Sequence, residues 1–144
     1  MTTRTTTLPF DDVEVGQELP EFVLDITPTI IVSTAIATRD YQDVHHDRDL
    51  AKQKGSKDIF MNILTTNGYV GRYITDWTGP EAILKHVGIR LGAPNYPYDS
   101  MRMTGTVSSK ELVDGEGIVT VDVVGRNSLG DHVVGTVRLA LPTA

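Results

Sequence analysis

The C-terminal part of the chain carries the pattern that most restricts its fold. Three runs of alternating apolar and polar residues cover positions 100–108, 118–126 and 132–141, and short segments rich in Gly, Asp and Asn separate them at 114–117 and 127–131. A period of two is typical of strands with one buried face, and short turns of this composition join antiparallel neighbours. The pattern therefore predicts an antiparallel meander of three strands.

One segment breaks this alternation. Between residues 62 and 77, Ile63, Val70, Ile74 and Trp77 recur at steps of seven, four and three. Such spacing places apolar side chains on one face of a helix, and the Gly79-Pro80 pair that follows is a helix stop signal. We predict one amphipathic helix of about four turns.

The remaining apolar segments complete the expected fold. Residues 84–91 and 22–26 fit strands, whereas the β-branched residues of 29–38 fit either a strand or a helical stripe. One long helix beside a long meander predicts an α+β fold in which the antiparallel sheet wraps around the helix. An open sheet leaves unpaired edges, so we expect a second copy or a related chain to pair with it.

Length and composition set outer limits. The 144 residues suffice for one domain; we expect a flexible arm over residues 1–10 and a single domain over residues 11–144. The absence of cysteine excludes disulfide scaffolds and thiol nucleophiles, and a net charge of −6 argues against a nucleic-acid partner. No apolar run reaches the roughly 18 residues of a membrane helix, and no signal-peptide pattern is present. We expect a cytoplasmic protein without a membrane partner.

Polar residues concentrate at positions 39–49, which hold two of the four histidines and four of the nineteen acidic residues. One interpretation is a solvated loop in which Asp47 caps a following helix. A second is a metal site of His45, His46 and Asp47, although adjacent side chains rarely converge on one ion. A third is acid–base catalysis, in which Asp40 and His45 hold one water between a carboxylate and an imidazole.

The sequence of residues 40–47, Asp-Tyr-Gln-Asp-Val-His-His-Asp, resembles the hydratase motif D-[FY]-N-P-[LIV]-H-x-D of the MaoC-like, R-specific enoyl-CoA hydratase family. The paired Asp40 and His45, the aromatic and aliphatic positions and the final aspartate match. Gln42 and Asp43 depart from the usual Asn-Pro. The resemblance extends over most of the chain.

The resemblance implies the hot-dog fold, with a short helix over residues 29–38. It also implies that Asp40 and His45 are catalytic. In the family, the thioester carbonyl lies at the N-terminus of the central helix, so the backbone N–H groups of Asn62 and Ile63 would bind substrate. Asn62 replaces a usual glycine, and asparagine there is equally typical of a helix N-cap. No metal and no cofactor is implied, because coenzyme A is part of the substrate.

Three less general runs, residues 38–48, 55–64 and 124–132, resemble the small subunits of two-subunit MaoC-like hydratases that act in actinobacterial steroid side-chain degradation. This implies a steroid enoyl-CoA substrate. It also implies a second MaoC-like subunit that lacks the Asp/His pair and is often joined to a DUF35 OB-type domain. A thiolase-like aldolase would then cleave the hydrated product.

Four further side chains are interpreted as ordinary strand residues. His86 and His132 lie in predicted strands. Arg90 and Arg102 could meet CoA phosphates, but strand arginines are usually solvated.

Other functions remain open at this level. The chain could be a homodimeric hydratase for short or medium acyl-CoA, a hot-dog thioesterase, a non-catalytic scaffold subunit or a small-molecule binding module. Thioesterases of this fold usually carry their acid on the central helix, whereas residues 62–77 have no acid before Asp76.

Overall fold

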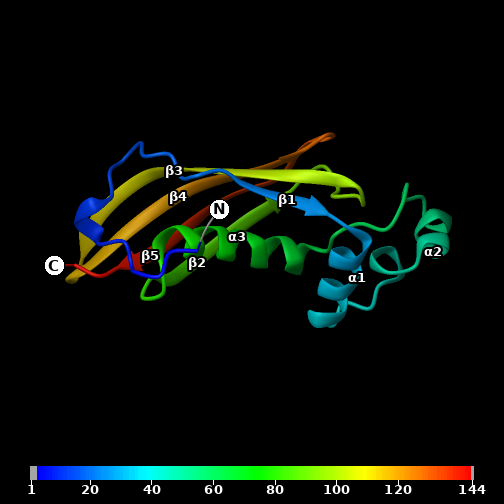
Figure 1. Cartoon of the computed structure of the whole chain (residues 1–144), viewed down its shortest axis with the longest axis horizontal. Coiled ribbons are helices and arrows are strands. Elements are labelled where there is room, and N and C mark those ends of the chain that lie inside the picture. The colour runs from blue at the N-terminus through cyan, green and yellow to red at the C-terminus, as the bar shows by residue number, and fades with distance from the viewer. Residues whose placement is uncertain (1–2, 144) are drawn as a thin grey trace.

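The computed structural model describes residues 3–143, in which one long helix lies along the inner face of a five-stranded antiparallel sheet (Figure 1). This is the arrangement predicted from the sequence. In chain order the elements are η1 (Phe10–Asp12), β1 (Phe22–Ile26), α1 (Pro28–Ala37), η2 (Asp43–His45), α2 (Arg48–Gln53), α3 (Ile63–Thr78), β2 (Ile83–Leu91), β3 (Asp99–Val113), β4 (Glu116–Asn127) and β5 (Gly130–Leu141).

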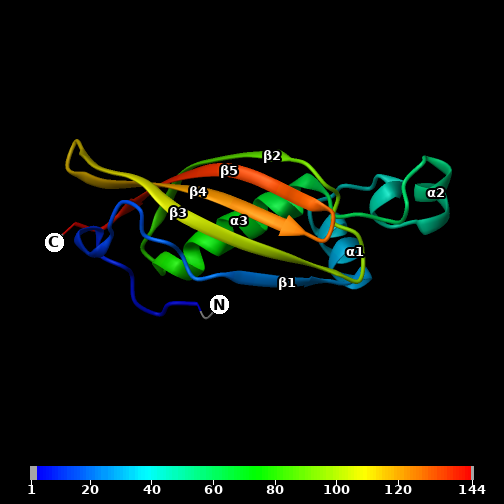
Figure 2. The same cartoon turned by 90° about the horizontal axis from the view of Figure 1, so that it is seen from above.

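The sheet has the strand order β1-β3-β4-β5-β2, so the predicted meander of β3, β4 and β5 forms its centre. Figure 2 shows β1 and β2 as the two edges, with α3 beneath the strands. Strand β3 continues to Val113, beyond the predicted end at residue 108. A register shift between Val107 and Ser109 places two exposed residues in succession, which interrupts the alternation.

The core forms between α3 and the inner face of the sheet. Val70, Ile74 and Trp77 of the predicted stripe are at most 5% exposed, and Tyr73 joins them at 0%. Ile63, the fourth member of the stripe, is 50% exposed because it lies in the first turn of α3. Fully buried side chains of this size each contribute about 1.5–3 kcal/mol. The sheet residues opposite are Met101, Met103, Val107, Val121, Val123, Val137 and Leu139.

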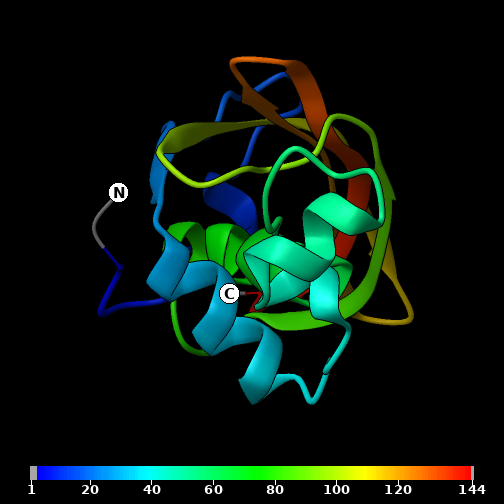
Figure 3. The ribbon, with the colours of Figure 1, turned by 90° about the vertical axis from the view of Figure 1, so that its right-hand side faces the viewer.

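The ambiguous segment 29–38 is helical and forms α1. The signals that decide this precede it: Thr27 accepts a hydrogen bond from the N–H of Ile30 as the N-cap, and Pro28 occupies the first turn. Ile31 and Ala35, one helical turn apart, are fully buried. Figure 3 shows α1 and α2 gathered at one end of the molecule, in front of α3 and the curved sheet.

Residues 3–10, within the predicted flexible arm, differ from that expectation; residues 1 and 2 lie outside the described residues. Leu8 donates a backbone hydrogen bond to Thr78, and Phe10 donates one to Pro142. Both side chains are less than 9% exposed and belong to the core. Apolar packing at these two positions overrides the threonine-rich composition. No helix within residues 3–143 has the length and apolar character needed to cross a bilayer.

We predict that Phe10→Ala lowers the free energy of unfolding by about 3 kcal/mol, since it removes a buried aromatic ring. Urea denaturation measures the change. Val15→Ala is the matched control, because Val15 is 62% exposed and its loss should change stability by less than about 0.5 kcal/mol. Equal, small effects of both substitutions would contradict the docked N-terminal segment.

Candidate active site

The position of Asp40 is set by the way α1 ends. The N–H of Asp40 donates to the carbonyl of Ala35 at 2.9 Å, and the N–H of Arg39 donates to Ile36 at 3.0 Å. This is a Schellman termination, which requires a left-handed residue, and Arg39 supplies it with a φ of 57°. A non-glycine residue there costs roughly 1–2 kcal/mol. The backbone of Asp40 is thereby anchored to the last turn of α1.

His45 lies in η2 and is 6% exposed. Its Nδ1 is 2.6 Å from the carbonyl oxygen of Phe60, and its ring packs edge-on against the Phe60 ring at 5.0 Å. A carbonyl only accepts hydrogen bonds, so Nδ1 carries the proton and Nε2 of the neutral ring has a free lone pair. That Nε2 lies 3.4 Å from Oδ2 of Asp40. The structure therefore brings the two predicted catalytic side chains together.

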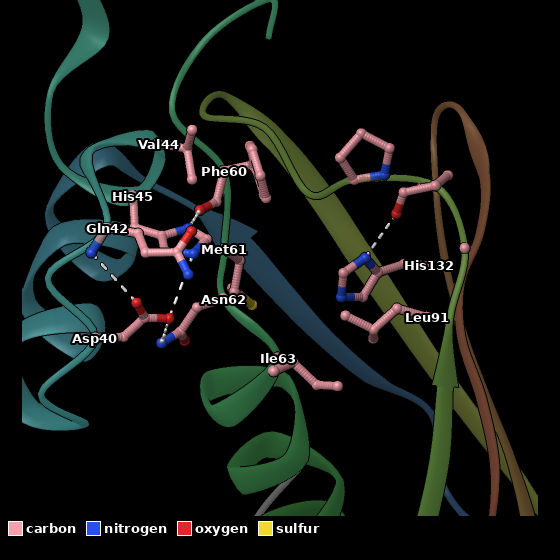
Figure 4. A pocket seen from close by; sticks show the side chains of 13 residues that line it. Asp40, Gln42, Val44, His45, Phe60, Met61, Asn62, Ile63, Leu91 and His132 are labelled. Atoms are coloured by element: carbon pink, nitrogen blue, oxygen red, sulfur yellow. Dashed lines mark hydrogen bonds and ion pairs between the residues drawn. The ribbon is translucent and has the colours of Figure 1, made fainter. Parts of the chain in front are cut away.

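Asn62 has two sets of contacts. As the N-cap of α3 its Oδ1 accepts a hydrogen bond from the N–H of Thr65 at 2.9 Å. Its Nδ2 donates to Oγ1 of Thr38 at 2.9 Å and to Oδ2 of Asp40 at 3.0 Å. Figure 4 shows Asp40, His45 and Asn62 meeting on one wall of a pocket. The capping interpretation of Asn62 is confirmed, and the contact with Asp40 was not predicted.

These contacts alter the electrostatics of Asp40. The hydrogen bond from Asn62 is the main influence that lowers the pKa of Asp40; burial opposes it, and the N–H of Gln42 and the His45 ring also lower it. The two hydrogen-bond donors and the electrostatic attraction to the His45 ring stabilise the ionised carboxylate more than the neutral acid. Asp40 is therefore a carboxylate at neutral pH.

The first turn of α3 lies beside this pair. The first N–H groups of a helix have no partner within the helix. Of these, the N–H of Thr65 donates to the Asn62 side chain. The N–H groups of Asn62 and Ile63 are not consumed by the cap, and both residues line the pocket. With the helix dipole they make a suitable place for a developing oxyanion.

The pocket has a volume of about 330 Å³, and its opposite wall comes from the end of β2, the residues that follow it, and β5. Thirteen residues line it: Asp40, Gln42, Val44, His45, Phe60, Met61, Asn62, Ile63, Leu91, Gly92, Ala93, Pro94 and His132. Most of the wall is apolar, which suits an acyl chain.

His132, which the sequence indicates as an ordinary strand histidine, also lines the pocket. It is 1% exposed, its Nδ1 donates to the carbonyl of Ala93 at 2.7 Å, and its Nε2 accepts from the hydroxyl of Thr66 at 2.8 Å. Burial lowers the pKa of His132. The neutral ring thus connects Ala93, which follows β2, to Thr66 in the first turn of α3 by two hydrogen bonds.

His46 and Asp47, the other two residues of the metal interpretation, have partners outside the pocket. His46 is exposed and donates to the carbonyl of Tyr41 at 3.1 Å. Asp47 is the N-cap of α2, as predicted. The three side chains of the metal interpretation thus have separate partners, and no group of three or more His, Asp or Glu that could hold a metal occurs within residues 3–143.

The two strand arginines considered for CoA binding lie outside this pocket. Arg102 forms an exposed ion pair with Glu21. Arg90 is exposed and lines a smaller neighbouring pocket with Gly92 and Asp131.

Comparison with known proteins identifies the family. No protein-family model matches the sequence. The chain is 58% identical over 127 residues to the 3-oxo-4,17-pregnadiene-20-carboxyl-CoA hydratase beta subunit of Mycobacterium tuberculosis strain H37Rv, covering 88% of this chain and 95% of the relative. The chain belongs to the MaoC-like enoyl-CoA hydratase family.

Solved structures agree that this chain belongs to the MaoC-like family. A chain in the crystal structure of the ChsH1-ChsH2 complex from Mycobacterium tuberculosis is 57% identical and superposes with a TM-score of 0.84 over 90% of this chain and 98% of that chain. The unliganded R-hydratase PhaJ1 of Pseudomonas aeruginosa, at 21% identity, shares the fold with a TM-score of 0.85 over 96% and 88% of the two chains. The hot-dog fold is confirmed.

We predict that this MaoC-like hydratase loses stability as the pH falls below 6.5, the ordinary pKa of histidine, partly through His132. The unfolded chain protonates His132 at a higher pH than the folded protein does, so acid favours unfolding. His132→Asn keeps a donor toward Ala93 and should reduce the stability difference between about pH 7.5 and about pH 5.5. Urea denaturation at both pH values tests this, and the exposed His86→Asn is the control. Equal pH dependence in wild type and His132→Asn would contradict it.

Proposed function

We propose that the protein adds water across the α,β double bond of a steroid side-chain enoyl-CoA, as the catalytic subunit of a heteromeric MaoC-like hydratase. One observation carries the proposal: an ionised Asp40 and a His45 with a free Nε2 lie 3.4 Å apart on the pocket wall that also presents the start of α3. This is the chemistry that hydration of an enoyl thioester requires.

The Asp40–His45 pair would hold and activate the water. A water between them can donate one hydrogen bond to the carboxylate and one to Nε2, which leaves an oxygen lone pair for Cβ. A neutral imidazole with an unprotonated Nε2 is a common general base in enzymes. Nε2 takes the proton, and the Asp40 carboxylate stabilises the resulting imidazolium.

The start of α3 would hold the thioester. As the new O–Cβ bond forms, the π electrons move through Cα onto the thioester oxygen, which becomes an enolate-like oxyanion. N–H groups of Asn62 and Ile63 directed at that oxygen would lower the barrier by roughly 3 kcal/mol for each donor. The acquired proton then passes to Cα, so that one water is added overall and the pair returns to its starting state.

The acyl group and the partner are carried over from the relatives. The 58% identical relative is named as a beta subunit that acts on 3-oxo-4,17-pregnadiene-20-carboxyl-CoA, and the similar crystal structure is of a complex. We propose that this chain pairs with a second MaoC-like subunit bearing a DUF35 OB-type domain, and that a thiolase-like aldolase takes the product.

A hydration assay tests the function. Loss of the enoyl-thioester absorbance is followed with a steroid enoyl-CoA and with crotonyl-CoA, for the chain alone and co-expressed with its MaoC-like partner. We expect turnover of the steroid thioester in the complex. Turnover of crotonyl-CoA by the chain alone would instead indicate a homodimeric hydratase, and release of free CoA would indicate a thioesterase.

We predict that Asp40→Asn and His45→Ala each lower kcat/KM at least about 100-fold while the fold is kept, because each removes one side of the water site. Circular dichroism and a thermal melt verify folding. His46→Ala is the matched control, since His46 is exposed and its ring donates to the Tyr41 carbonyl, away from the water site; its kcat/KM should stay within about threefold. Near-normal turnover by either pair variant would refute these roles.

A further inference from the structure

We infer that the side chain of Asn62 is a positioning residue: it holds the Asp40 carboxylate against His45 and ties it to the first turn of α3. This role belongs to the side-chain amide and is separate from the backbone N–H of the same residue. The inference rests on the proposed function for its catalytic consequence, but its structural part stands on the contacts alone.

The orientation of the Asn62 amide is unambiguous. Its oxygen accepts from the N–H of Thr65, which is a donor only, so the nitrogen must be on the other side. That nitrogen lies 2.9 Å from Thr38 Oγ1 and 3.0 Å from Asp40 Oδ2 and can donate one N–H to each. The side chain is 2% exposed, and all three contacts are within the protein. A buried amide with its oxygen and both N–H groups bonded has one stable position.

The same contacts immobilise the carboxylate. Oδ2 of Asp40 accepts from Asn62 and faces Nε2 of His45, while Oδ1 accepts from the N–H of Gln42 at 3.3 Å. Both oxygens are therefore held, and the plane of the carboxylate is defined. A water that bridges Asp40 and His45 would meet groups already in place, which avoids reorganisation during the reaction.

The amide also controls the charge of Asp40. Two groups face the carboxylate besides the Gln42 N–H: the His45 ring from η2 and the uncharged Asn62 amide from the start of α3. Arg39, its chain neighbour, is exposed. Burial alone would raise the pKa of Asp40, and the Asn62 hydrogen bond is the largest opposing influence. Without that donor, the carboxylate would protonate at a higher pH.

Asn62 also links the two halves of the reaction. Its side-chain oxygen caps the N-terminus of α3, whose first N–H groups would bind the thioester oxygen. Its side-chain nitrogen donates to the Asp40 carboxylate, which would bind the water. The two reacting ends of an enoyl thioester, Cβ and the carbonyl oxygen, are separated by a fixed length. One short, rigid amide thus sets the corresponding separation in the protein.

Two substitutions separate the capping role from the positioning role. Asn62→Ser and Asn62→Asp both retain a good N-cap oxygen for the Thr65 N–H. Neither can donate two N–H groups, and the aspartate adds a second carboxylate beside Asp40. We expect both variants to fold and to lose about 10- to 100-fold in kcat, with Asn62→Asp the more affected. The pKa of the Asp40 carboxyl should rise in both, because each variant loses the amide donor.

Thr27→Ala is the matched control. It removes the N-cap of α1, so it lowers stability by about 1 kcal/mol, but Thr27 lies at the opposite end of α1 from Asp40. Its kcat should stay within about threefold, and the pKa of its Asp40 carboxyl should not move. A shift confined to the Asn62 variants would separate positioning from a general loss of stability.

A measurement independent of turnover completes the test. Carbon-13 NMR titration of the Asp40 carboxyl reports its pKa in wild type, Asn62→Ser and Asn62→Asp, and we expect an upward shift in both variants. An unshifted Asp40 pKa in folded variants overturns the inference, as does wild-type kcat in both variants. If wild-type protein hydrates no enoyl-CoA, the proposed function fails, while the NMR shift still decides whether Asn62 holds Asp40.

Discussion

The structure depends on covering the apolar face of α3. An isolated helix of this length is marginal in water, so its stability must come from packing. The antiparallel sheet supplies that cover in one continuous curved layer, because short turns keep successive strands adjacent (Figure 3). Large apolar side chains remain uncovered in the first turn of the helix, where Ile63 and Leu64 are 50% and 49% exposed. The pocket forms at that uncovered end, next to a rigid core.

Three segments meet at this end: the termination of α1, the turn η2 that follows it closely, and the start of α3. Each is defined by its own local chemistry. A left-handed Arg39 ends α1, a carbonyl contact orients His45, and the Asn62 cap begins α3. Side chains on such anchored termini are placed more accurately than those on free loops. The polar cluster is thus ordered although its composition resembles a solvated loop.

Much of this could be predicted from the sequence, because alternation and helical spacing directly encode burial. The five strands and α3 follow from these periods, and Asp40 and His45 stood out by their spacing and resemblance. Contacts between residues far apart in the sequence, which depend on how the strands pair, could not be predicted. His132 meets Ala93 and Thr66, which are 39 and 66 residues away along the chain, only because β2 pairs with β5 beside α3. Docking of the N-terminal segment likewise depends on contacts with distant residues, and the sequence of the segment itself carries no pattern that predicts them.

The contact between Phe10 and Pro142 has a consequence for biosynthesis. The ribosome synthesises residue 10 early and residue 142 near the end. The N-terminal segment therefore cannot make its contact with Pro142 until that residue has been synthesised. Strand β2 likewise cannot pair until its partner β5 has been synthesised. Such non-local closure is slow relative to helix formation. Part of the apolar face of α3 therefore stays exposed in the nascent chain until the last strand emerges, and exposed apolar surface of this kind is what chaperones bind.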